Sequence, residues 1–219
     1  IKGDMNNWQK DEAYRLQPIG NGIWEAKLPE KAMAHGQMYK LLVEWNGGYG
    51  ERIPSYVRRV VQDEQTKIFS AQVWNEPEYQ WKNRKPHPTS PQGRRKSSNE
   101  ALFIYECHIG MSSKEEKVNS YEEFRRDVLP RIDKLGYNCV QIMAIQEHPY
   151  YGSFGYHVSN FFAASSRFGT PNELKALIDD AHGRGMHVIM DLVHSHAVKN
   201  ELEGLGKFDG TGYQYFHDG

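Results

Sequence analysis

The chain has 219 residues and a formal net charge of −1, with 38% hydrophobic and 25% charged residues. These values are typical of a globular protein, and a charge near zero gives no overall field that would attract nucleic acid or an anionic membrane. No apolar run approaches the ~20 residues that a membrane-spanning helix needs. The totals favour one or two folded domains without a nucleic-acid or membrane partner.

The two cysteines, Cys107 and Cys139, both lie in apolar, strand-like runs. We expect them to be buried, reduced thiols rather than a disulfide, which is typical of a reducing compartment. No signal-peptide pattern opens the sequence. These observations favour a cytoplasmic location.

Residues 1–81 predict an all-β region. Residues 21–28, NGIWEAKL, begin with an Asn-Gly turn pair and then alternate between apolar and polar positions. In residues 38–45, MYKLLVEW, apolar residues alternate with Lys40 and Glu44, which we expect on the solvent face.

Three tryptophans in this region are candidates for either core or sugar-contacting positions. We expect Trp24 and Trp45, which lie on alternating strand faces, to be core residues. Trp8 follows a turn, so a surface contact with a sugar is an equal alternative for it.

Residues 82–96, KNRKPHPTSPQGRRK, have six Lys or Arg, three Pro and no acidic residue. A polyanion-binding patch is one interpretation, but the charges follow no helical face. We favour a basic, proline-rich linker over residues 82–99.

From residue 100 the pattern predicts alternating strands and helices. Residues 101–109 form a short apolar strand, and Ser120 with Glu123 forms a capping box that begins a helix. The apolar stripe of that helix is interrupted by Pro130, which should kink it. The stripe consists of Phe124, Val128, Ile132 and Leu135.

Two further strands and a second helix follow. Residues 138–145 and 186–193 are nearly continuous apolar strands, and the intervening helix begins at Thr170-Pro171-Asn172-Glu173. The β-α-β-α-β order implies parallel strands with right-handed crossovers. Such folds place their sites at the carboxyl ends of the strands.

Polar and aromatic residues gather after the second and third strands. Residues 146–169 form an unusually long connection that is rich in aromatic side chains, and Asp191 interrupts the end of the third strand. A buried carboxylate must be paired or hydrogen-bonded, so Asp191 is a candidate site residue. Aromatic rings with hydroxyl-binding Asp and His side chains suit a neutral, hydroxyl-rich ligand. His194 and His196 also raise a metal site as an alternative, although no third ligand is evident.

Residues 191–196, DLVHSH, resemble the first signature region of the α-amylase superfamily of glycoside hydrolases and transglycosylases. Residues 147–200 resemble more closely the matching stretch of 1,4-α-glucan (glycogen or starch) branching enzymes, and residues 104–113, IYECHIGMSS, resemble their first barrel strand. Three N-terminal segments resemble the starch-binding-type β-sandwich of these enzymes: residues 3–8, 21–25 and 51–75.

The resemblance implies a multidomain fold. An immunoglobulin-like all-β sandwich of the carbohydrate-binding module 48 type and its exit segment would occupy residues 1–81. The first part of a (β/α)₈ TIM barrel, about three of its eight strands, would occupy residues 100–219. We expect the chain to lack the first strands of the sandwich and to be an internal piece of a longer glycoside hydrolase family 13 protein.

The resemblance also implies roles for individual residues. Asp191 would help to hold the catalytic centre through a hydrogen-bonded Arg, His196 would contact the glucose unit at the cleavage subsite, and Tyr156 would stack on that glucose. The nucleophilic Asp and the acid Glu would follow Gly219, in the remainder of the same polypeptide. Glu106 and Glu147 lie at strand ends but have no partner carboxylate, so we expect this chain alone to be inactive.

The implied parent activity is transfer of an α-1,4-glucan chain to a glucose 6-hydroxyl in glycogen or starch biosynthesis, without a cofactor or metal. The expected partner is an α-1,4-glucan such as glycogen, starch or a maltooligosaccharide. The alternatives are a non-catalytic α-glucan-binding module, an α-glucan hydrolase or debranching relative, and a metal-dependent hydrolase.

Overall fold

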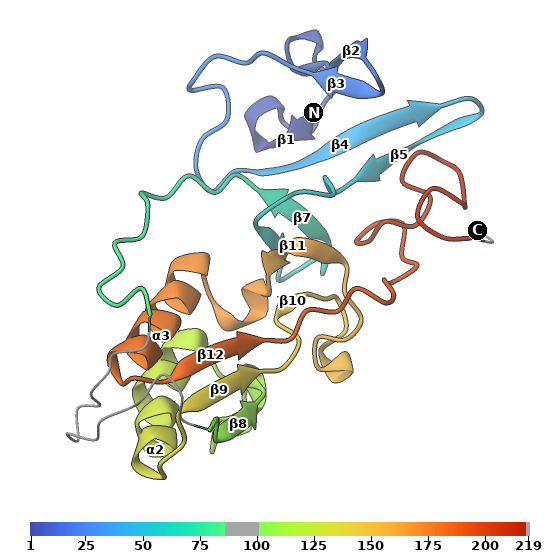
Figure 1. Cartoon of the computed structure of the whole chain (residues 1–219). Coiled ribbons are helices and arrows are strands. Elements are labelled where there is room, and N and C mark those ends of the chain that lie inside the picture. Colours follow the sequence, from blue (N-terminus) through green and yellow to red (C-terminus); the bar gives the residue numbers. More distant parts are fainter. Residues whose placement is uncertain (86–100, 218–219) are drawn as a thin grey trace. The chain divides into compact units, whose positions relative to one another are not determined.

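The computed structural model describes residues 1–85 and 101–217 (Figure 1). It contains two compact units. The first comprises Ile1–Glu76, His157–Ala163 and Ser195–Gly219, and the second comprises Pro77–Tyr156 and Ala164–His194. Most of the predicted basic linker, residues 82–99, lies outside the described residues, so it stays a prediction together with its boundaries.

The first unit contains a five-stranded antiparallel sheet and a separate two-stranded ribbon. The sheet has the order β1-β4-β7-β6, and β5 pairs with β4. These strands agree with the all-β prediction, whereas an immunoglobulin-like sandwich stays a prediction. The sheet strands are β1 (Lys2–Gly3), β4 (Met38–Trp45), β5 (Gly48–Arg52), β6 (Val60–Gln62) and β7 (Phe69–Gln72), and the ribbon strands are β2 (Gln17–Gly20) and β3 (Ile23–Glu25).

Two sequence expectations for the first unit are wrong. Trp24 is 60% exposed, because it lies in the ribbon, of which every strand residue is exposed. Lys40 of β4 is only 3% exposed, although its charge predicted the solvent face. Strand alternation separates the two faces, but it does not determine which face becomes buried. Trp45 is partly buried, with the Arg52 guanidinium 5.3 Å from its ring centre.

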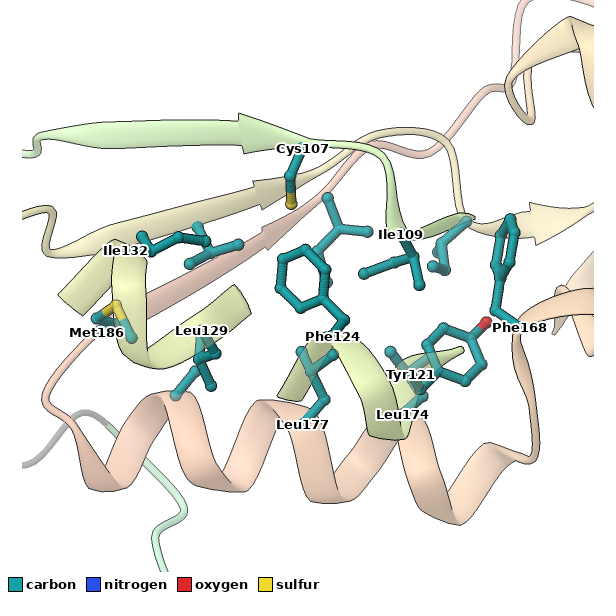
Figure 2. Close-up of a cluster of buried hydrophobic side chains, with 14 residues drawn as sticks. Cys107, Ile109, Tyr121, Phe124, Leu129, Ile132, Phe168, Leu174, Leu177 and Met186 are labelled. Carbon is teal, nitrogen blue, oxygen red and sulfur yellow. The ribbon is translucent and has the colours of Figure 1, made fainter. Parts of the chain in front are cut away.

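The second unit contains a three-stranded parallel sheet of order β12-β9-β8, as the β-α-β-α-β pattern predicts. Its strands are β8 (Ile104–Cys107), β9 (Cys139–Ile142) and β12 (His187–Met190). A cluster of buried side chains lies between this sheet and the helices (Figure 2). Both cysteines are buried free thiols, as expected, and burial raises the pKa of Cys107 to about 12.

The helix α3 (Pro171–Gly183) follows its sequence signals closely. Thr170 and Glu173 form the predicted capping box, and Pro171 occupies the first turn. Its Leu174, Leu177 and Ala181 face the core. Beyond the helix, Gly185 has a φ of 73°, a conformation that glycine adopts readily.

The other helical segment departs from a regular helix. After α1 (Tyr121–Glu123), residues Phe124–Val128 form a π-helical turn, and α2 (Leu129–Lys134) follows with Pro130 in its first turn. The wider turn accommodates a proline that would clash with the carbonyl four residues before it. It also rotates the buried face, so Leu129 is fully buried and Leu135 is 71% exposed. The predicted stripe is therefore wrong at Leu135.

The described residues contain two further short strands. β10 (Gln146–Glu147) belongs to the second unit. β11 (Asn160–Ala164) belongs to the first unit except for its last residue. In the described part of the chain, no helix is long and apolar enough to span a bilayer.

Candidate functional site

The carboxyl ends of the three parallel strands lie at one edge of the sheet. Ile142, the last residue of β9, is opposite Cys107 of β8 and Met190 of β12. The Asp191 amide donates to the Ile142 carbonyl at 3.0 Å and continues the ladder by one residue. Residues that follow these strands therefore emerge together, as expected for a parallel α/β fold.

Asp191 is partly buried, and its carboxylate accepts two hydrogen bonds at this edge. Oδ1 accepts from Gln141 Nε2 at 3.0 Å, and Oδ2 accepts from the Tyr156 hydroxyl at 3.5 Å. This pairing is what a partly buried carboxylate requires. Burial and then the negative charges of Asp191 and Glu106 raise the pKa of Tyr156. The phenol therefore stays protonated at neutral pH and can act as a donor.

A tight approach of two backbone segments places Tyr156 at the edge. Phe154 and Gly155, which precede it, have φ angles of 55° and 90°. A Cβ atom at Gly155 would lie 1.8 Å from the Ala144 carbonyl oxygen, so only glycine fits there. The chain consequently turns against the end of β9 and brings Tyr156 to Asp191.

Glu147 is 1% exposed, and its carboxylate accepts hydrogen bonds from backbone amides of the long connection, residues 146–169. Its Oε2 accepts from the Ser166 amide at 2.7 Å, and its Oε1 accepts from the His148 amide at 3.2 Å. Burial raises the pKa of Glu147 although these bonds oppose the effect. Both carboxylate oxygens are thus engaged in hydrogen bonds that close the loop.

The predicted site residues do not all fall in one unit. Tyr156 and Asp191 meet in the second unit, whereas His196 and Trp8 belong to the first. His196 Nδ1 is 3.0 Å from Ser195 Oγ, and its ring centre is 6.5 Å from that of His157. Trp8 is partly exposed and donates from Nε1 to Asp4 at 2.9 Å. Their sugar contacts stay predictions.

Sequence reasoning missed Gln141 and Gln146. Gln141 holds Asp191, and Gln146 Oε1 accepts from the Val193 amide at 2.8 Å. Polar residues within and just after the apolar run of residues 138–145 were the available signal. Within residues 1–85 and 101–217, no three His, Cys, Asp or Glu side chains are grouped so that they could hold a metal ion.

Comparisons with known proteins find similarity to a family model, to solved structures and to curated sequences. Residues 126–203 match the family model of the alpha-amylase catalytic domain. The chain is similar in fold, with a TM-score of 0.65 and 20% identity, to the catalytic module of the glycogen-degrading pneumococcal virulence factor SpuA, covering 85% of this chain and 32% of that one. It is also similar to a putative alpha amylase from Salmonella typhimurium, with a TM-score of 0.57 and 23% identity, covering 87% of this chain and 28% of that one.

These matches define the class: the chain shares the fold of α-amylase-family TIM-barrel proteins. The sequence relatives are more particular. The chain is 46% identical to the 1,4-alpha-glucan-branching enzyme of Yarrowia lipolytica over 100% of its length, and 49% identical to branching enzyme 2-2 of Arabidopsis thaliana over 99%. It is therefore a homologue of 1,4-alpha-glucan-branching enzymes along its whole length, which confirms the resemblance. It spans 32% and 27% of these two relatives.

Proposed function

We propose that the chain is part of a 1,4-α-glucan branching enzyme, which cleaves an α-1,4-glucan and transfers the released chain to a glucose 6-hydroxyl. The observation that carries the proposal is the Tyr156–Asp191 pair at the carboxyl edge of a parallel sheet, in a chain 44–49% identical to branching enzymes. The fold alone would be compatible with several glucan-active proteins.

The pair suits a bound glucose unit. The ring of Tyr156 offers an apolar face for sugar C–H groups, while its protonated hydroxyl is tied to Asp191. Asp191, fixed in turn by Gln141, positions charged groups of the catalytic centre rather than reacting itself. His196 contributes a sugar contact in the intact protein.

The reaction would proceed with retention through a covalent glycosyl-enzyme. That chemistry requires two carboxyl groups ~5–5.5 Å apart, one as the nucleophile and one as the acid. We assign neither role to a residue of this chain. The relatives are about three to four times as long, and we place the nucleophilic Asp and the acid Glu in the corresponding remainder of the polypeptide.

Three further assignments belong to the proposal. The antiparallel strands of the first unit belong to a starch-binding sandwich of the carbohydrate-binding module 48 type, with Trp8 as a surface contact. The three parallel strands are the beginning of a (β/α)₈ barrel. The protein acts in the cytoplasm in glycogen or starch synthesis.

The test is incubation of the intact protein with amylose while iodine-complex absorbance and reducing ends are followed together. Branching lowers the absorbance without a matching rise in reducing ends. A matching rise in reducing ends would instead indicate a hydrolase, and an unchanged spectrum would indicate a binding module. Either of these results would reject the proposal.

Site variants connect the activity to the geometry. Asp191→Asn keeps the shape but removes the charge, and we expect a loss of activity of about 100-fold from misplaced groups. Tyr156→Ala should raise KM more than it lowers kcat. Tyr213→Ala, at an exposed tyrosine of the first unit, is the control and should leave both constants unchanged.

A further inference from the structure

Three buried polar atoms of the second unit lie outside the Asp191 site. They are Nε2 of His108, Nε2 of His148 and Nε of Arg167, and none has a hydrogen-bond partner among the described residues. His108 is 9% exposed and His148 is 0% exposed. An unsatisfied buried polar group costs roughly 1–3 kcal/mol, so three in one place call for a physical explanation.

The second nitrogen of each imidazole determines which tautomer is present. His108 Nδ1 accepts from the Met111 amide at 3.2 Å, so Nε2 carries the proton and is a donor. His148 Nδ1 lies 2.9 Å from the Gln146 carbonyl oxygen, which can only accept. The proton of His148 is therefore on Nδ1, and its Nε2 is an acceptor. Burial lowers the pKa of both rings, which keeps them neutral.

Each of the three groups lies beside one or both of the aromatic rings of Tyr151 and Phe168. The His108 ring centre is 5.7 Å from Tyr151 and 5.5 Å from Phe168, and the His148 ring centre is 6.2 Å from Phe168. The Arg167 guanidinium lies 5.5 Å from the Tyr151 ring centre. After burial, the neighbouring His148 also lowers the pKa of His108, and the neighbouring Arg167 also lowers the pKa of His148. Two orphan donors and one orphan acceptor therefore share one neighbourhood.

We propose that His108, His148 and Arg167 form a buried site for a single water molecule. The water accepts from His108 Nε2–H and Arg167 Nε–H, and it donates to His148 Nε2. Three hydrogen bonds are typical of buried water in proteins. An anion would face the lone pair of His148, and a cation would lie beside the guanidinium, so a neutral ligand with both donor and acceptor capacity fits best.

The site joins three segments of the second unit. His108 follows β8, His148 follows β10, and Arg167 lies in the 3₁₀ turn Ser166–Phe168. The water would therefore stabilise the two ends of the connection, residues 146–169, that carries Tyr156. This inference does not depend on branching activity, and it can fail or hold independently of the proposed function.

The test is a high-resolution crystal structure of the intact protein, together with ¹H–¹⁵N spectra of the histidine rings at neutral pH. We expect a water peak about 2.7–3.2 Å from each of the three atoms. We also expect His108 protonated at Nε2 and His148 at Nδ1. A direct His108–His148 hydrogen bond would overturn the proposal. So would the absence of a water peak between the three side chains, or a charged His148 ring.

Variants give a second readout. His148→Phe keeps an aromatic ring but removes the acceptor, so the water peak should disappear. His148→Gln keeps an acceptor and should retain it, which preserves the test if the phenylalanine variant does not fold. His187→Phe changes an exposed histidine of the same sheet and should leave the peak in place. Retention of the water in His148→Phe would contradict the proposed ligand set.

Discussion

The two units differ in how they bury apolar side chains. Among the described residues, the main cluster of the second unit has fourteen buried side chains between a parallel sheet and helices, whereas that of the first has six. The first unit also exposes its β2–β3 ribbon. The central strand β9 is buried along most of its length and has a mainly apolar sequence, as expected for a parallel strand covered on both faces. The burial of an antiparallel strand depends on packing partners that its own sequence does not identify.

We expect the largest effect from a substitution in the hydrophobic core of the second unit. Leu177 is fully buried in α3, so Leu177→Ala should lower the free energy of opening of β9 by about 3 kcal/mol through lost burial and a cavity. Amide hydrogen exchange followed by mass spectrometry would measure this locally. Unchanged exchange in β9 would contradict the account of this core.

A polar anchor gives the next largest effect. Asp179 of α3 is 3% exposed and accepts from Tyr79 Oη, the Lys82 and Asn83 amides, and Asn83 Nδ2. Asp179→Ala would leave these donors without an acceptor, and we expect a loss of about 2 kcal/mol in the opening free energy of α3. Asp180→Ala removes only an i,i+4 pair with Arg184 and should cost under about 0.5 kcal/mol. Equal losses in the two variants would contradict this account.

The same anchor predicts a pH dependence. Burial opposes the ionisation of Asp179, but the hydrogen bonds outweigh it and hold the pKa of its carboxyl below the ordinary 3.8. A group with a depressed folded pKa stabilises above its unfolded value and loses that contribution as pH falls through the folded value. If other carboxylates dominate acid unfolding, Asp179→Ala should unfold at a higher pH than the wild type, because its stability at neutral pH is already lower. The difference in stability between wild type and this variant should shrink below pH 3.8.

Helix capping gives an intermediate effect. Thr170 Oγ1 accepts from the Glu173 amide at 3.2 Å, so Thr170→Ala should destabilise α3 by about 1 kcal/mol. Thr170→Ser retains the hydroxyl and should recover most of the loss. Hydrogen exchange of the first turn of α3 is the measurement, and equal exchange in both variants would show that the cap contributes nothing.

The smallest effect sharpens the contrast with the first unit. Trp24 is 60% exposed, so Trp24→Ala should change the opening free energy of β4 by less than about 0.5 kcal/mol. A loss comparable to that of Leu177→Ala would show that Trp24 is buried in the intact protein and that the exposed ribbon has a partner there.

Local signals predicted the second unit well. Capping residues, the parallel strands and the position of Asp191 at a strand end followed from the sequence, because each depends on neighbours in the chain or on strand ends that a parallel sheet aligns. Tyr156 was named only through the resemblance to branching enzymes, and its hydrogen bond to Asp191 came from the structure. The π-helical turn before Pro130 did not follow, because its register depends on tertiary packing. The partnership of Gln141 with Asp191 also required the paired strands, since fifty residues separate them.

The central claim is that Tyr156 and Asp191 together form part of a glucose-binding site. A crystal structure of the intact protein with maltoheptaose tests it most directly. The account predicts a glucose ring against the face of Tyr156, with the Tyr156 hydroxyl still beside Asp191. Glucan bound only elsewhere, with the Tyr156 ring turned away from Asp191, would contradict it.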